Sequence, residues 1–155
     1  MKQQIIDIFP QEFYKNAAYW RGFALALVYL LMAVAQLFSY EDFPDVVAAY
    51  GLAGGPVTVV ILAVLLPLLE GLALPYLLSM KLGAAWRQVS RGAMLAAPAL
   101  WLVVAVLVNI VATDGINSGL LGATLPTANG WWLVAFAGLL LWSAILVVRE
   151  LPERK

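Results

Sequence analysis

One carboxylic acid stands alone in an almost wholly apolar stretch. Residues 51–80 read GLAGGPVTVVILAVLLPLLEGLALPYLLSM, and Glu70 is their only acidic side chain. Roughly 20 apolar residues in a helix span a bilayer core, so this stretch is long enough to cross a membrane. A charged carboxylate near the middle of a span costs roughly 3 kcal/mol or more. We therefore expect a neutral acid that either handles protons or a ligand, or holds neighbouring helices together.

Two prolines flank Glu70 in the same stretch, and a proline, having no N–H, leaves the carbonyl four residues before it unpaired. Pro67 leaves the carbonyl of Ala63 unpaired. Pro75 does the same to Gly71, the residue after Glu70. In lipid, such carbonyls need partners from other helices, a ligand or water. The sequence therefore predicts a concentration of polar groups around Glu70, unless the prolines only bend the helix.

The composition is that of an integral membrane protein. The 155 residues are 64% hydrophobic, whereas soluble domains are roughly 45–50% apolar. The apolar runs do not alternate with polar residues, which favours helices over a membrane barrel. Cysteine and histidine are absent, which excludes thiol–disulfide chemistry, the usual zinc sites, haem ligation by these residues and histidine-dependent triads. With zero net charge and no basic run, nucleic acid is not expected as a partner.

Four apolar segments predict an all-α integral membrane four-helix bundle that forms a single domain over residues 1–155. The spans are expected at about 17–38, 56–79, 92–112 and 131–148. The helices are expected to pack against one another, and their expected surroundings are a lipid bilayer.

Two connections between the spans have sequences that indicate their structure. In residues 39–52, apolar side chains recur at helical spacing, which predicts a short amphipathic helix lying on the membrane after the first span. These side chains are Phe43, Val46, Val47 and Tyr50. Residues 113–130 are rich in turn residues and long for a connection in a bundle.

Charge predicts the topology. All nine Lys and Arg residues fall on one side of the four-span arrangement: Lys2, Lys15, Arg21, Lys81, Arg87, Arg91, Arg149, Arg154 and Lys155. The other side carries only acids: Glu41, Asp42, Asp45 and Asp114. By the positive-inside rule, both termini are expected in the cytoplasm.

Depth along the helices brings further side chains to the level of Glu70. Glu70 lies roughly 15 Å from the inner end of its helix, close to the midplane. At similar depth the other spans carry Tyr29, Trp101, Trp142 and Ser143, and we expect Tyr29, Trp101 or Ser143 to hydrogen-bond Glu70. The group is either a satisfied core network or a pocket for a flat ligand such as a quinone. Gln36 and Asn109 lie nearer the outer face, where they could bridge helices or line an entrance.

The loop FPDVVAAYGL is followed by a span that contains PLLEGLAL. This order resembles the DoxX/MauE superfamily of small four-span bacterial membrane proteins, over about residues 20–148. The family pattern has a phenylalanine and a tyrosine in that loop and P-x-x-E in the second span. The matching residues are Phe43, Tyr50, Pro67 and Glu70.

The MauE branch is similar again after the third span. Its pattern there has an asparagine, a glycine and a pair of cysteines, and this chain has Asn109 and Gly115. Ser118 and Leu120 stand where the cysteines would be. The resemblance therefore implies the scaffold, and the thiol-redox role of that branch does not carry over.

The resemblance implies a membrane subunit or helper of a larger redox or maturation system in the bacterial inner membrane, more a non-catalytic subunit than a stand-alone enzyme. Its outer loops would face a membrane or periplasmic protein partner. One alternative is a quinone-linked oxidoreductase subunit in which Glu70 exchanges a proton with the quinone; no other cofactor and no metal is predicted. Another is a carrier for a small solute, which would need a homo-oligomer because four spans enclose only a small pore.

Overall fold

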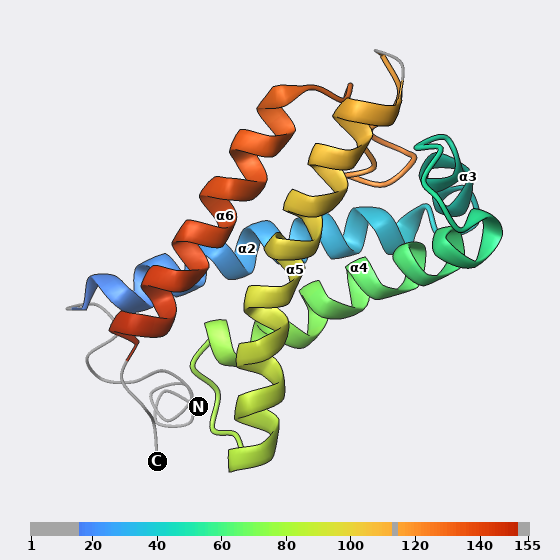
Figure 1. The fold of residues 1–155 in the computed structure, drawn as a ribbon. Coiled ribbons are helices and arrows are strands. Elements are labelled where there is room, and N and C mark those ends of the chain that lie inside the picture. The colour runs from blue at the N-terminus through green and yellow to red at the C-terminus, as the bar shows by residue number, and fades with distance from the viewer. Residues whose placement is uncertain (1–15, 113–114, 152–155) are drawn as a thin grey trace.

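Four long helices and one short helix make up the computed structural model, which describes residues 16–112 and 115–151 (Figure 1). The long helices are α2 (Ala17–Phe38), α4 (Gly55–Leu77), α5 (Ala84–Val111) and α6 (Trp131–Glu150). The short helix α3 (Phe43–Ala48) follows α2. Over these two ranges no strand is formed, and the one isolated β-bridge joins Asn117 to Ala128. The predicted all-α fold is confirmed.

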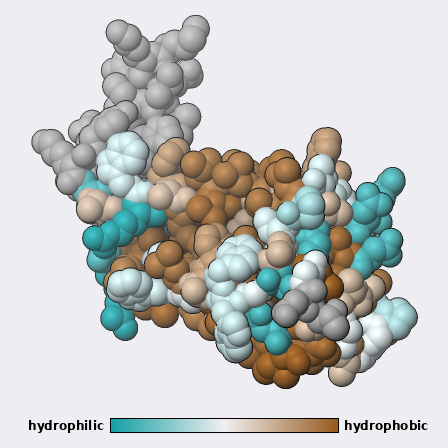
Figure 2. All heavy atoms as spheres, turned by 90° about the horizontal axis from the view of Figure 1, so that it is seen from above, coloured by the Kyte–Doolittle hydropathy of each residue, from teal (hydrophilic) through white to brown (hydrophobic). Residues whose placement is uncertain are grey.

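The surface of the helices is apolar where a membrane would surround it. All four long helices are long and apolar enough to cross a membrane. Large side chains such as Leu31, Val60 and Ile110 are more than half exposed. Figure 2 shows a brown, hydrophobic region between hydrophilic groups at either end of the molecule. In water such a surface would drive aggregation, so the fold is that of a membrane four-helix bundle.

Helix α4 is central to the packing, because it contacts α2 on one side and α5 on the other, and α5 in turn packs against α6. A small residue permits one close approach: a Cβ added to Gly22 would lie 2.8 Å from the carbonyl oxygen of Leu77. At the same end of the bundle the exposed side chains of Arg21 and Glu150 form an ion pair between α2 and α6. An exposed pair of this kind contributes roughly 0–1 kcal/mol.

Near two of the prolines inside helices, a side chain from a neighbouring helix hydrogen-bonds the backbone. Pro98 cannot donate to the carbonyl of Met94 in its own helix, and the hydroxyl of Tyr29 donates to that carbonyl instead, at 2.9 Å. Beside Pro75, the hydroxyl of Ser90 donates to the carbonyl of Leu72 at 2.6 Å and accepts from the amide of Tyr76 at 3.0 Å. Both contacts join helices where the backbone ladder is weakest.

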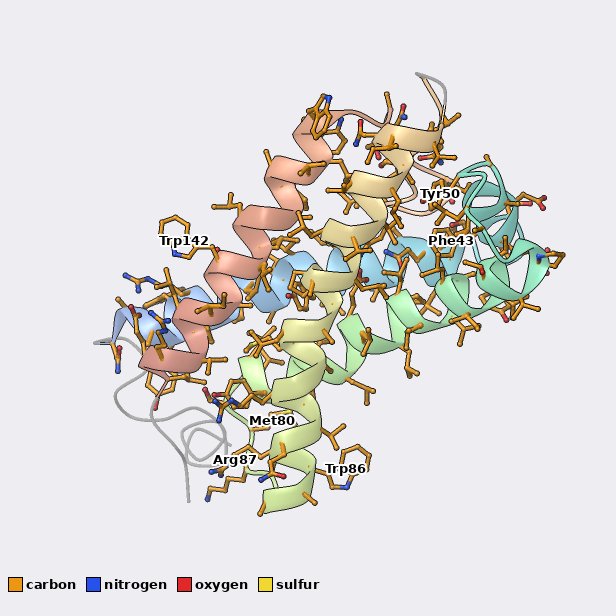
Figure 3. The ribbon with its side chains drawn as sticks, in the orientation of Figure 1. Phe43, Tyr50, Met80, Trp86, Arg87 and Trp142 are labelled. Atoms are coloured by element: carbon orange, nitrogen blue, oxygen red, sulfur yellow. The ribbon has the colours of Figure 1, made fainter. Side chains whose placement is uncertain are left out.

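The third long helix begins earlier than the sequence predicts. The spans predicted at about 56–79 and 92–112 leave the residues between them as a connection, but α5 begins at Ala84 rather than at about residue 92. The buried contacts of Ser90 with α4 and the good helix formers in this segment explain the extension. The 28 residues of α5 are roughly 42 Å long by helical rise, longer than a bilayer core. Trp86 and Arg87 lie on this extension (Figure 3).

The predicted short helix after the first span is confirmed as α3. Its apolar face is turned toward the bundle, with Phe43 and Val47 buried, and Tyr50 just after it is also buried. The acids Glu41 and Asp42, which precede α3, are exposed. We call the end of the bundle that carries α3 the outer end, following the charge-based prediction. Four of the nine cations used for that prediction lie outside the described residues: Lys2, Lys15, Arg154 and Lys155.

Candidate functional site

The carboxyl group of Glu70 is fully buried and receives hydrogen bonds from two other helices. The indole Nε1 of Trp101 on α5 donates to Glu70 Oε1 at 2.7 Å. The side-chain amide Nε2 of Gln36 on α2 donates to the same oxygen at 3.4 Å. Both partners are themselves buried. Glu70 therefore joins α2, α4 and α5. The sequence predicts that Glu70 faces the bundle interior and that Trp101 is one of its hydrogen-bond partners, and both features are present.

Gln36 connects this group to the outer loop. Besides Glu70, its Nε2 donates to the backbone carbonyl of Leu120 at 3.2 Å. Gln36 lies two residues before the end of α2, whereas Glu70 lies fifteen residues after the start of α4. Their contact means that α4 begins farther out than α2 ends, which Figure 1 shows by the position of α3 beyond the end of α2. The depth estimate from sequence missed this contact because it assumed helices in register.

Residues 115–130, which we call the outer cap, are folded against the outer end of α2 and against α3. The Ser39 hydroxyl accepts a hydrogen bond from the amide of Ala123 at 2.8 Å. The Tyr50 hydroxyl donates to the carbonyl of Ser118 at 2.6 Å. Burial raises the pKa of Tyr50, so the phenol keeps the proton that this bond requires. Figure 3 shows Tyr50 and Phe43 between α3 and the cap.

The outer cap has its own internal order. The side chain of Asn117 donates to the carbonyl of Gly122 at 3.0 Å and accepts from the amides of Gly119 and Thr127. The Ser118 and Thr127 hydroxyls are hydrogen-bonded to each other. Leu120, which belongs to the cap, is buried. A loop held by so many specific contacts is a folded lid over the outer end of the bundle.

Two glycines permit the close approach of the cap. Gly119 and Gly122 have φ of +70° and +68°, which favours glycine. A Cβ at Gly119 would lie 2.3 Å from the Tyr50 hydroxyl, and one at Gly122 would lie 2.4 Å from the carbonyl oxygen of Ala35. The G-x-x-G spacing of Gly119 and Gly122 is the signal in the sequence that could have indicated this close approach.

Glu70 and Gln36 form the polar centre of the bundle, and each has one buried oxygen without a hydrogen-bond partner in residues 16–112 and 115–151: Glu70 Oε2 and Gln36 Oε1. A buried acceptor without a donor costs roughly 1–3 kcal/mol. A proton carried on Glu70 Oε2 would make that atom a donor, which agrees with the neutral acid expected from its position in a span. Gln36 Oε1 is free to accept a hydrogen bond from a bound donor, and Glu70 Oε2 is free to bind a ligand or exchange a proton.

The expected hydrogen bond from Tyr29 to Glu70 is not formed. Tyr29 is buried, but its hydroxyl donates to the carbonyl of Met94. Pro98 leaves that carbonyl without its helical donor, so the carbonyl accepts the hydrogen bond that the phenol donates. Pro67, the proline of the family pattern, is buried within α4 one turn before Glu70.

The expectation that α6 contributes to the group is wrong. Trp142 is 61% exposed and points away from the bundle in Figure 3. The Ser143 hydroxyl donates to the carbonyl of Leu139 in its own helix at 2.8 Å. The buried face of α6 is instead formed by small and aliphatic residues: Leu133, Ala137, Leu140, Ala144 and Val147. Packing against α5 turns this face inward and Trp142 toward lipid.

Asn109 bridges two elements near the outer end. Its Nδ2 donates to the carbonyl of Ala105 at 2.7 Å and to that of Gly130 at 3.2 Å. Gly130 directly precedes α6, so Asn109 joins the last turns of α5 to the start of α6. It lies on the cap side of the bundle without a hydrogen bond to Glu70.

Fold and site together define a class: a multi-pass helical membrane protein with a buried acid joined to a folded outer cap. No protein-family model, curated protein or solved structure matches the chain.

Proposed function

We propose that this chain is a non-catalytic membrane subunit or helper of a redox or maturation system of the DoxX/MauE type. The observation that carries the proposal is that three of the four family-pattern residues are connected to the outer cap. Phe43 and Tyr50 lie directly under the outer cap, and Glu70 reaches the same cap through Gln36. A pattern that serves only to span a membrane would not need its members to meet at one loop.

The outer surface is where a partner would dock. It consists of the cap, where Leu125 is 57% exposed, and of the exposed acids Glu41 and Asp42 beside α3. A membrane or periplasmic protein with a basic patch complements these charges. Docking on the cap would act on Gln36, and through it on Glu70, because one amide nitrogen contacts both.

This role places the chain in the bacterial inner membrane with both termini in the cytoplasm and the cap outside. The cations on the described part of the chain agree with that orientation, because the helices alternate in direction. Arg21 lies in the second turn of α2, Arg149 in the last turn of α6 and Arg87 in the first turn of α5.

A site-directed cross-link tests both the orientation and the partner. The chain contains no cysteine, so Asp42→Cys and Gln88→Cys each create a single thiol, both at exposed positions. A membrane-impermeant thiol reagent carrying a photo-crosslinker, added to spheroplasts of the native host, should label Asp42→Cys alone. Illumination should then give one discrete heavier adduct, which Glu41→Lys in the same chain should weaken because it repels a basic partner.

Labelling of Gln88→Cys instead would reverse the orientation. Labelling of Asp42→Cys without any adduct, or with adducts to this chain alone, would argue against a partner at this surface.

A second candidate function is favoured by the unpartnered Glu70 Oε2: a quinone-linked subunit in which that oxygen exchanges a proton with the quinone. Glu70→Gln keeps an acceptor for Trp101 but cannot exchange a proton. We expect a quinone to be extracted with the wild-type protein, and reduction of an added quinone analogue by the native membrane to stop in Glu70→Gln while the protein still assembles. Unchanged reduction in Glu70→Gln would leave Glu70 a structural group.

A further inference from the structure

A groove opens on the outer half of the molecule between α3 and the first turns of α4. Its volume is about 440 Å³, within the range of small-molecule sites. Most of its wall is apolar, and one carboxylate reaches it. The residues that matter are Asp45 and Ala48 from α3, Leu52 from the connection, and Pro56, Val59 and Val60 from α4.

The groove exists because the chain turns sharply between the two helices. Gly51, Gly54 and Gly55 all have positive φ. The positive φ at all three positions favours glycine, and a Cβ at Gly54 would also lie 2.0 Å from the Thr58 hydroxyl. A Cβ at Gly55 would meet nothing within 4 Å, and this open space belongs to the groove, which Gly55 lines.

The groove lies where an outer leaflet would change from acyl chains to headgroups. It begins at α3, beside the exposed acids, and continues onto the first turns of α4. Beyond it, the apolar face of α4 continues with Ile61 and Val64, both about half exposed. A molecule with a polar head and a long apolar tail matches this gradient.

Asp45 gives the groove its chemical preference. Its side chain is exposed, and in residues 16–112 and 115–151 the one ion pair joins Arg21 to Glu150, at the opposite end of the bundle. The hydroxyl of Thr58, the other polar side chain of the groove, already donates to the carbonyl of Ala53 at 2.9 Å. Among the residues that the structure describes, no cation pairs with this carboxylate. The groove therefore suits an ammonium group and repels an anionic headgroup.

We propose that this groove binds a phospholipid with an ammonium headgroup, phosphatidylethanolamine, with the amine at Asp45 and an acyl chain along Val59 and Val60. The proposal is independent of the partner and of the chemistry of Glu70. It differs from the general lipid shell of a membrane protein because one headgroup is preferred and one site holds it.

Native mass spectrometry of the full-length protein in detergent tests the proposal. The probes are phosphatidylethanolamine and phosphatidylglycerol with the same acyl chains. We expect one ethanolamine lipid to remain bound at collision energies that remove the glycerol lipid. Asp45→Asn should weaken ethanolamine-lipid binding about fivefold, the upper value for an exposed ion pair, and Val60→Trp should abolish it by filling the groove.

Matched controls lie next to both positions. Asp42→Asn removes a neighbouring exposed acid outside the groove, and Val57→Trp adds the same indole to an exposed α4 position that does not line it. Both controls should bind as wild type does. Equal retention of the two lipids by the wild type, an unchanged preference in Asp45→Asn, or an equal loss in Val57→Trp would each overturn the proposal.

Discussion

Gly122→Ala should open the outer cap. The residue has φ of +68°, which costs a non-glycine residue roughly 1–2 kcal/mol. Its new Cβ would also lie 2.3 Å from the Ser39 hydroxyl and 2.4 Å from the Ala35 carbonyl oxygen. Because the Ala35 atom is backbone within α2, the cap must move away. Amide exchange over residues 116–129 should therefore accelerate by more than about tenfold, since each 1.4 kcal/mol corresponds to a factor of ten.

Gly115→Ala is the matched control. Gly115 also belongs to the cap and has φ of +91°, but a Cβ there would meet nothing within 4 Å. It therefore carries the backbone strain without the clash, and its effect on exchange should be clearly smaller. Equal acceleration in the two variants would mean that the contact with α2 does not hold the cap closed. Exchange within α4 and α6 reports whether the bundle itself stays intact.

The features that the sequence predicts well are local ones. The positions of the four long helices follow from the length of the apolar runs, and α3 follows from the spacing of Phe43 and Val47. The burial of Glu70 and its bond to Trp101 follow from depth, because two polar groups at one level in a bundle tend to meet. These inferences need no knowledge of how the helices rotate.

The sequence does not predict how each helix is rotated about its own axis, and this rotation decides which side chains face the bundle interior. Trp142 has the right depth for Glu70 but lies on the lipid face, because the small residues of α6 pack inward. Tyr29 faces inward, yet its hydroxyl goes to the carbonyl released by Pro98. Because Pro98 leaves the carbonyl of Met94 free, the sequence does offer this carbonyl as a partner for Tyr29.

The outer cap was not predictable, because contacts distant in sequence hold it. Ser39 binds Ala123, Tyr50 binds Ser118, and Gln36 binds Leu120. None of these pairs has a periodicity that marks it in a single sequence. The turn-rich composition of residues 113–130 predicts a connection, and the chain folds much of that connection into a lid.

Gln36→Leu should loosen the cap from within the bundle. Leucine has a similar size but leaves the buried carbonyl of Leu120 without the donor that it now has. An unsatisfied buried acceptor costs roughly 1–3 kcal/mol, partly offset because the unpartnered Gln36 Oε1 is removed as well. Glu70 keeps its bond from Trp101, so we expect the bundle to assemble. The free energy for opening the cap should fall by about 1–2 kcal/mol, at the lower part of that range.

Amide hydrogen exchange of residues 116–123 in Gln36→Leu tests most directly whether Glu70 and the cap form one unit. The control is Gln88→Leu, which removes an exposed glutamine from the other end of the bundle. The link through Gln36 predicts exchange about 5- to 30-fold faster in Gln36→Leu, from the same 1–2 kcal/mol, and unchanged in Gln88→Leu. Exchange in Gln36→Leu that matches the wild type, while Gly122→Ala still opens the cap, would contradict the account and leave Glu70 isolated beneath it.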